Sequence, residues 1–143
     1  MSDAGRTEAK AEMDALLDAL IRFAQEMLAK QGEFFPFAAA VTGTGAVEMV
    51  GGYTGEERPP SQAVIELLYQ RLADRARSGE IRASGVCFDV RLPERDNSDA
   101  IQVSLENASA EPVNVFLPYR RQRLHGVKYS ELFATPGERR IFS

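Results

Sequence analysis

The sequence contains one cysteine, Cys87, one histidine, His125, and no tryptophan. A single thiol cannot form a disulfide within the chain, and it cannot supply a zinc site built from several cysteines. So few thiols are typical of a reducing compartment, and we therefore expect a cytoplasmic protein. Cys87 and His125 are the one thiol–imidazole pair that the chain offers for nucleophilic catalysis, and nothing near Cys87 in the sequence indicates a group that would activate it.

Long apolar runs and nucleotide-binding or metal-binding motifs are also missing. No stretch approaches the roughly 18 apolar residues of a membrane span, and no basic segment followed by an apolar run opens the chain, so neither membrane insertion nor secretion is expected. The glycines at 43 and 45 join two apolar runs, as hairpin glycines do. The acidic cluster at 96–99 lacks the ligand spacing of a calcium loop and fits a polar turn. We expect no metal and no cofactor, and a non-enzymatic protein is favoured.

Charge is divided unequally along the chain. Residues 1–111 hold 19 acidic and 11 basic side chains, whereas residues 112–143 hold 2 acidic and 6 basic ones. The isoelectric point of about 5.1 lies far below the value above about 9 that is typical of nucleic-acid-binding domains, so nucleic acid is not an expected partner. The basic run at Arg120, Arg121 and Arg123 is either a solubilising strand end or a patch for an acidic protein surface or an anionic ligand.

Hydrophobic periodicity predicts two amphipathic helices. Apolar residues recur every three or four positions from Thr7 to about Lys30 and again from Gln62 to Ser78. Thr7 and Ser61 are expected to cap the two helices, and a glycine stands shortly after each predicted end. Both helices need an apolar surface to cover.

Five strands are predicted, at 36–41, 46–50, 86–92, 101–106 and 113–119. Thr42-Gly43-Thr44-Gly45 joins the first two as a hairpin, and polar turns join the last three as a meander. Residues 120–143 leave two alternatives open. They form a short helix around Glu131 followed by a terminal strand, or they cross the core as an ordered tail.

These elements predict a single α+β domain over residues 1–143, with residues 1–6 disordered. An antiparallel sheet of five strands, or slightly more, carries the two helices in the order α-β-β-α-β-β-β plus a tail. Over residues 7–119 this order resembles the roadblock and profilin-like architecture, in which a five-stranded antiparallel sheet carries helices. The resemblance rests on element order and not on a motif. It implies a protein-binding or dimerising module.

One face of the predicted strands is a candidate binding surface. If both helices cover the other face, the side chains that point away from them are those of Cys87, Asp89, Arg91, Gln102, Ser104, Glu106, Asn114 and Phe116. This mixed face is either solvated, with Arg91 and Glu106 paired across strands, or it binds a partner. Phe116 keeps the second interpretation open, because an aromatic ring on a wet face anchors a partner or is covered by the tail.

Two functional hypotheses follow from these patterns. In the first, the protein is a bacterial-type interaction or regulatory module that self-associates as a two-fold dimer through a sheet edge or a helix face. In the second, it senses a small molecule or anion in a pocket between the sheet and the C-terminal tail. No catalytic residue is predicted. The candidate binding residues are Arg91, Glu106, Phe116, Tyr119, Arg120, Arg121 and Arg123.

Overall fold

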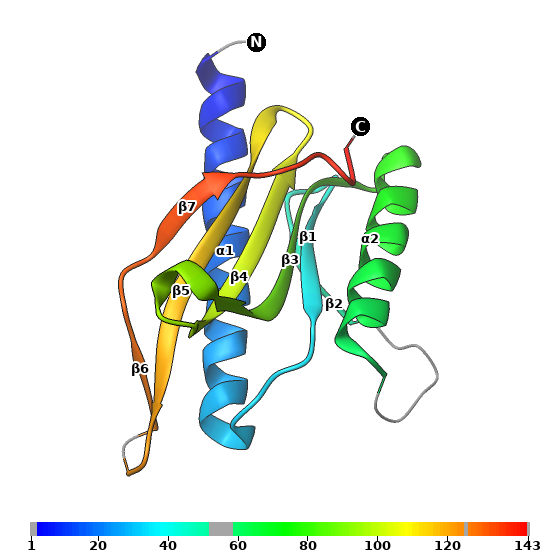
Figure 1. Cartoon of the computed structure of the whole chain (residues 1–143). Coiled ribbons are helices and arrows are strands. Elements are labelled where there is room, and N and C mark those ends of the chain that lie inside the picture. Colours follow the sequence, from blue (N-terminus) through cyan, green and yellow to red (C-terminus); the bar gives the residue numbers. More distant parts are fainter. Residues whose placement is uncertain (1–2, 52–58, 125, 143) are drawn as a thin grey trace.

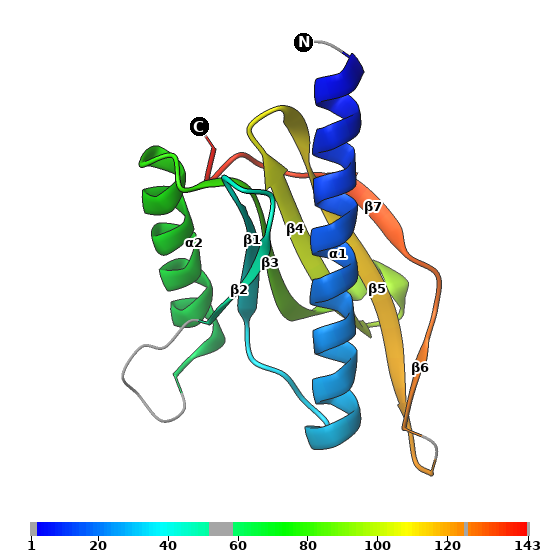
Figure 2. The same cartoon turned by 180° about the vertical axis from the view of Figure 1, so that it is seen from behind.

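The computed structural model describes residues 3–51, 59–124 and 126–142, and it confirms the predicted α+β class. Two helices lie on a curled antiparallel sheet that has seven strands in the described residues (Figures 1 and 2). The elements in chain order are α1 (Asp3–Gln31), β1 (Phe37–Thr42), β2 (Val47–Gly51), α2 (Ser61–Arg77), β3 (Ile81–Leu92), the 3-10 turn η1 (Pro93–Arg95), β4 (Ser98–Asn107), β5 (Ala110–Gln122), β6 (Gly126–Tyr129) and β7 (Phe133–Pro136).

Both helices were predicted, but their starts differ from the prediction. α1 begins before Thr7, so Thr7 lies inside the helix and does not cap it. In α2 the N-cap position is Pro60, no side chain caps the helix, and Ser61 is the first helical residue. The predicted ends are confirmed, because Gly32 (φ 77°) and Gly79 (φ 78°) take the left-handed conformation that favours glycine.

The sheet order is β2-β1-β3-β4-β5-β6, and β7 also pairs with β5. The predicted hairpin is β1–β2, and the predicted meander is β3–β4–β5. The tail forms two short strands and has no helix around Glu131. After β7 the chain crosses the ends of the central strands and reaches α2 (Figure 1). Residues 120–143 therefore combine added strands with an ordered crossing segment.

The two helices lie on opposite faces of the sheet, and each covers a core of its own (Figure 2). The core under α1 includes Cys87 and Val103, which stand opposite each other on β3 and β4. The core under α2 includes Ala38, Ala40 and Val86. Burial on both faces explains why β1 is an unbroken apolar run and does not alternate.

This arrangement corrects the predicted polar face. Strand register places Cys87, Asp89 and Arg91 on the α1 side of the sheet. The other members of the predicted face, Gln102, Ser104, Glu106, Asn114 and Phe116, lie on the α2 side. The prediction was wrong because it assumed that both helices cover the same face. Sequence periodicity identifies the two faces of each strand but not how the faces of successive strands match.

Candidate functional site

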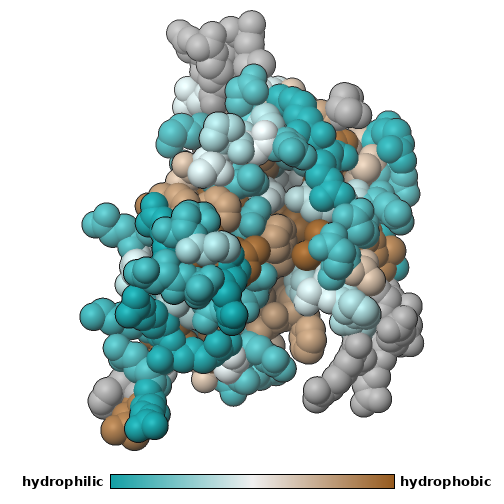
Figure 3. All heavy atoms as spheres, in the orientation of Figure 1, coloured by the Kyte–Doolittle hydropathy of each residue, from teal (hydrophilic) through white to brown (hydrophobic). Residues whose placement is uncertain are grey.

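A pocket of about 310 Å³ lies on the α2 side of the sheet, which we call the α2 pocket. Helix α2, strands β3, β4 and β5, and the chain after β7 surround it; it is lined by Gln62, Ile65, Tyr69, Phe88, Gln102, Ser104, Asn114, Pro136, Glu138 and Arg140. On this side of the molecule, hydrophilic side chains frame a central hollow with apolar atoms between the sheet and α2 (Figure 3). A pocket between sheet and tail therefore exists, although its residues differ from the predicted ones.

The floor of the α2 pocket is a row of hydrogen-bonded polar side chains. The Gln102 amide donates to Ser104 Oγ over 3.1 Å, and Ser104 Oγ donates to Asn114 Oδ1 over 2.8 Å. All three residues are half-buried. Phe116, the next residue on this face of β5, stacks on Phe133 of β7 with ring centroids 5.0 Å apart. The C-terminal strand thus covers Phe116, which was one of the two predicted explanations for this ring.

One wall of the pocket is a charged cluster in which the positive charge is already paired. Arg140 lies over the Tyr69 ring, 3.7 Å from its centroid, and donates to both carboxylate oxygens of Glu66 at 3.1 Å. Burial raises the pKa of the Tyr69 hydroxyl above its usual range. One guanidinium group, that of Arg140, therefore lines the pocket. It is already paired with the Glu66 carboxylate and stacked on the Tyr69 ring.

Glu106 holds the segment that closes the pocket, residues 137–142, which we call the C-terminal strap. Glu106 is 2% exposed, and its carboxylate accepts the backbone N–H groups of Arg140 at 2.9 Å, Ile141 at 3.1 Å and Phe142 at 3.5 Å. Ile141 is buried in the α2 core. The predicted cross-strand pair between Arg91 and Glu106 does not form, since these residues lie on opposite faces. Glu106 is a structural anchor of the strap.

On the α1 side, Tyr119 and Arg91 meet two carboxylates near the β3–β4 turn. The buried Tyr119 hydroxyl donates to Asp89 over 2.8 Å, and Arg91 lies 3.9 Å from Asp99. Burial raises the pKa of Asp89, and the hydrogen bond from Tyr119 partly offsets this shift. Burial also raises the pKa of Tyr119, as does the hydrogen bond to Asp89.

Two of the predicted arginines, Arg91 and Arg121, lie near the same carboxylate, that of Asp99, on the α1 side of the sheet. Arg121 donates twice to the carbonyl oxygen of Gly32, at 3.2 and 2.7 Å, and lies 3.6 Å from Asp99. A cation at the C-terminal end of α1 opposes the negative end of the helix dipole. Arg120 and Arg123 are exposed, on β5 and in the turn after it. Tyr119, Arg120 and Arg121 are not among the residues that line the α2 pocket.

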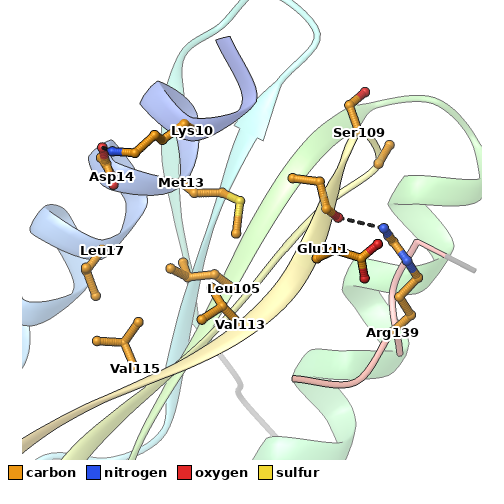
Figure 4. Close-up of a pocket in the computed structure, with 12 residues that line it drawn as sticks. Lys10, Met13, Asp14, Leu17, Leu105, Ser109, Glu111, Val113, Val115 and Arg139 are labelled. Carbon is orange, nitrogen blue, oxygen red and sulfur yellow. Dashed lines mark hydrogen bonds and ion pairs between the residues drawn. The ribbon is translucent and has the colours of Figure 1, made fainter. Parts of the chain in front are cut away.

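A second hollow, of about 630 Å³, is a groove between α1 and strands β4 and β5 (Figure 4). Met13 and Leu17 of α1 face Leu105, Val113 and Val115 of the sheet across it. Its rim carries both signs of charge; Lys10 and Asp14 pair with each other at 3.1 Å on α1, and Glu111 and Arg139 lie at the opposite end. The groove is therefore apolar, and the positive and negative charges named at its rim are equal in number.

Strand β2 is the open edge of the sheet next to β1. Val47 and Met49 point to the α1 side and are 42% and 46% exposed. On the same side Phe23 of α1, 40% exposed, packs on Phe37, the β1 residue opposite Gly51. Glu48, on the other side of the strand, pairs with Arg75 at 3.2 Å. No strand among the described residues pairs with the outer side of β2, so this edge combines free backbone groups there with exposed apolar side chains.

The thiol predicted as the one possible nucleophile of a thiol–imidazole pair lies in the α1 core. Cys87 is fully buried, and burial raises the pKa of its thiol well above the usual range, with the negative charge of Asp89 adding to the shift. His125 lies outside the described residues. Within residues 3–51, 59–124 and 126–142, no three His, Cys, Asp or Glu side chains gather as metal ligands would.

Neither described helix is long and apolar enough to span a membrane.

Comparison with models of protein families, with curated proteins and with solved structures found no match. The geometry of the described residues is therefore the basis on which a function can be assigned.

The candidate binding residues predicted from the sequence do not include four residues of interest, Val47, Met49, Tyr69 and Arg140. A signal was present for the first two, because strand 46–50 has no lysine or proline and carries a single charged residue, Glu48, to protect an edge. No comparable signal exists for Tyr69 and Arg140. They come from segments about 70 residues apart in the chain and meet only in the folded protein.

Proposed function

We propose that this protein is a non-enzymatic interaction module that associates with a second copy of itself through the β2 edge. The observation that carries the proposal is an edge strand with two exposed apolar side chains, in regular register with β1 and without a bulge. An exposed edge offers unpaired N–H and C=O groups to another strand, and natural proteins usually protect it. The element order, which resembles the roadblock and profilin-like architecture, favours a dimerising module of this kind.

Antiparallel pairing of two β2 strands fits a two-fold axis centred on Met49. Strand β2 runs from Val47 to Gly51, so Met49 faces Met49 of the second copy while Val47 faces Gly51. An axis perpendicular to the sheet keeps the α1 sides of both copies on the same surface. Val47, Met49 and Phe23 of each copy then form one continuous apolar patch between the two α1 helices.

The energetic contribution of Met49 follows from its exposure. Full burial of a methionine is worth about 1.5–3 kcal/mol, so burying the exposed 46% contributes about 1 kcal/mol per copy. In Met49→Lys both contributions are lost, and two ammonium groups a few ångströms apart add about 1 kcal/mol of repulsion. The total of about 3 kcal/mol corresponds to a dimer dissociation constant about 100-fold higher than that of the wild type.

Sedimentation equilibrium and light scattering across micromolar concentrations test the proposal. We expect a reversible monomer–dimer equilibrium for the wild type and a monomer for Met49→Lys. Leu132→Lys is the matched control, because Leu132 is 51% exposed and is not part of β2. A wild type that stays monomeric throughout, or a Leu132→Lys variant that dissociates as readily as Met49→Lys, contradicts the proposal.

Charge reversal tests the register itself. Met49→Glu and Met49→Lys are each expected to be monomeric, but their mixture is expected to form a heterodimer, since opposite charges then meet at the two-fold axis. Absence of the heterodimer while the wild type dimerises indicates that association uses another surface.

A further inference from the structure

We propose that the α2 pocket binds an uncharged polar ligand that offers both a hydrogen-bond donor and an acceptor on a flat ring. This inference is independent of the proposed dimer, because the pocket lies on the α2 side of β3–β5 and the β2 edge does not line it.

The hydrogen-bonding capacity of the pocket floor is only partly used by the protein. Within the described residues, Gln102 donates one amide hydrogen to Ser104, and Asn114 accepts from Ser104 through Oδ1. A side-chain amide has two donor hydrogens and a carbonyl acceptor. The Gln102 carbonyl and the Asn114 NH₂ group have no hydrogen-bond partner in the part of the chain described. The floor thus offers an acceptor and a donor, which suit a ligand carrying both.

The charges around the pocket disfavour an anion. The Arg140 guanidinium is paired with Glu66 and stacked on Tyr69, so an anionic ligand would have to compete with the Glu66 carboxylate for it. Glu138 adds a negative charge to the lining. A cationic ligand would have to leave water for a pocket whose floor is neutral amides and a hydroxyl. An uncharged ligand avoids both costs.

The remaining wall is apolar. Phe88 of β3 and Ile65 of α2 are half-buried and line the pocket together with Tyr69. An aromatic ring and a branched aliphatic side chain provide a surface for the face of a flat ring, while the amides at the floor select its polar edge. This division between an apolar wall and a few placed polar groups is typical of small-molecule sites.

Three probes of nearly the same size separate the alternatives. Nicotinamide is neutral and carries an amide, nicotinate is an anion, and 3-picoline lacks the amide. We expect nicotinamide at millimolar concentration to produce saturable shifts of the Gln102 and Asn114 side-chain amide signals in NMR spectra. Nicotinate and 3-picoline should bind at least about tenfold more weakly, because each charged or missing polar group costs about 1.4 kcal/mol or more. Equal or tighter binding of nicotinate, or no saturable shift with nicotinamide, overturns the proposal.

Variants locate the site. Asn114→Asp replaces the amide donor with a carboxylate of the same shape, and Gln102→Leu removes the acceptor; each should weaken nicotinamide binding at least about fivefold, as expected for one lost hydrogen bond. Gln70→Glu is the control for an amide-to-acid change, because Gln70 is exposed on α2 and does not line the pocket. Thermal unfolding of each variant shows whether it is folded. Unchanged binding in both folded variants overturns the assignment.

Discussion

Replacement of Glu106 by alanine is expected to release the C-terminal strap and to destabilise the whole domain. Glu106 is 2% exposed, and its carboxylate accepts the backbone N–H groups of Arg140 at 2.9 Å, Ile141 at 3.1 Å and Phe142 at 3.5 Å. Hydrogen bonds to a charged group are each worth about 1.5–3 kcal/mol. Alanine removes all of these bonds and also exposes Ile141, which packs in the α2 core.

The expected loss is about 3–6 kcal/mol of unfolding free energy, because the two shorter hydrogen bonds to the charged group are worth about 1.5–3 kcal/mol each. For a chain of 143 residues, each kcal/mol changes the melting temperature by roughly 3–5 °C, so the midpoint should fall by about 10–30 °C. Thermal unfolding followed by circular dichroism measures this difference. Amide hydrogen exchange measured by NMR should show that the Arg140 and Ile141 amides are protected in the wild type and unprotected in the variant.

Two further variants make the Glu106 prediction specific. Glu106→Gln keeps one acceptor oxygen and should lose less stability than the alanine variant, which also provides a folded protein if the alanine variant does not fold. Glu111→Ala removes an exposed carboxylate from β5 and should change stability by no more than about 0.5 kcal/mol. If Glu106→Ala melts within about 2 °C of the wild type with the Ile141 amide still protected, the carboxylate does not anchor the strap.

Three other predictions concern the α1 side of the sheet. Gly85→Ala should lose about 1–3 kcal/mol of stability, because its Cβ would lie 2.5 Å from Leu20 Cδ1. Gly43→Ala is the control, because no atom lies within 4 Å of a Cβ at that position. Equal chemical denaturation midpoints for the two variants would contradict the argument. The pKa of Asp89 is raised in the folded protein, so its contribution to stability falls as pH rises from the ordinary pKa of 3.8 through the raised value. Asp89→Asn, which keeps an acceptor for Tyr119, should therefore be more stable than the wild type at pH 7 and lose this advantage below pH 3.8. Urea titrations at both pH values measure the difference, and an advantage that persists in acid would point to another cause. Cys87 is fully buried with a raised thiol pKa, so a thiol reagent should modify it only after unfolding, and rapid modification of the native protein would be inconsistent with the packing against α1.

The sequence by itself determined the class of the fold and the positions of most elements. Periodicities of 3.6 and 2 are local consequences of how side chains project from helices and strands, so both helices and the five strands of the hairpin and meander were predictable from apolar spacing. Gly32 and Gly79 marked helix ends because few other residues adopt a positive φ at low cost. The helix starts were less predictable, since Pro60 precedes α2 and no side chain caps it.

Only the tertiary structure decided which residues meet. Alternation along a strand defines two faces but does not say which face of β3 continues that of β4, and the pairing of Cys87 with Val103 settles this for these two strands. The same pairing placed Arg91 and Glu106 on opposite sides. The anchor between Glu106 and the strap, the stacking of Arg140 on Tyr69 and the openness of the β2 edge depend on contacts between distant segments. No local pattern encodes such contacts, because each partner is an ordinary surface residue in its own element until the chain folds.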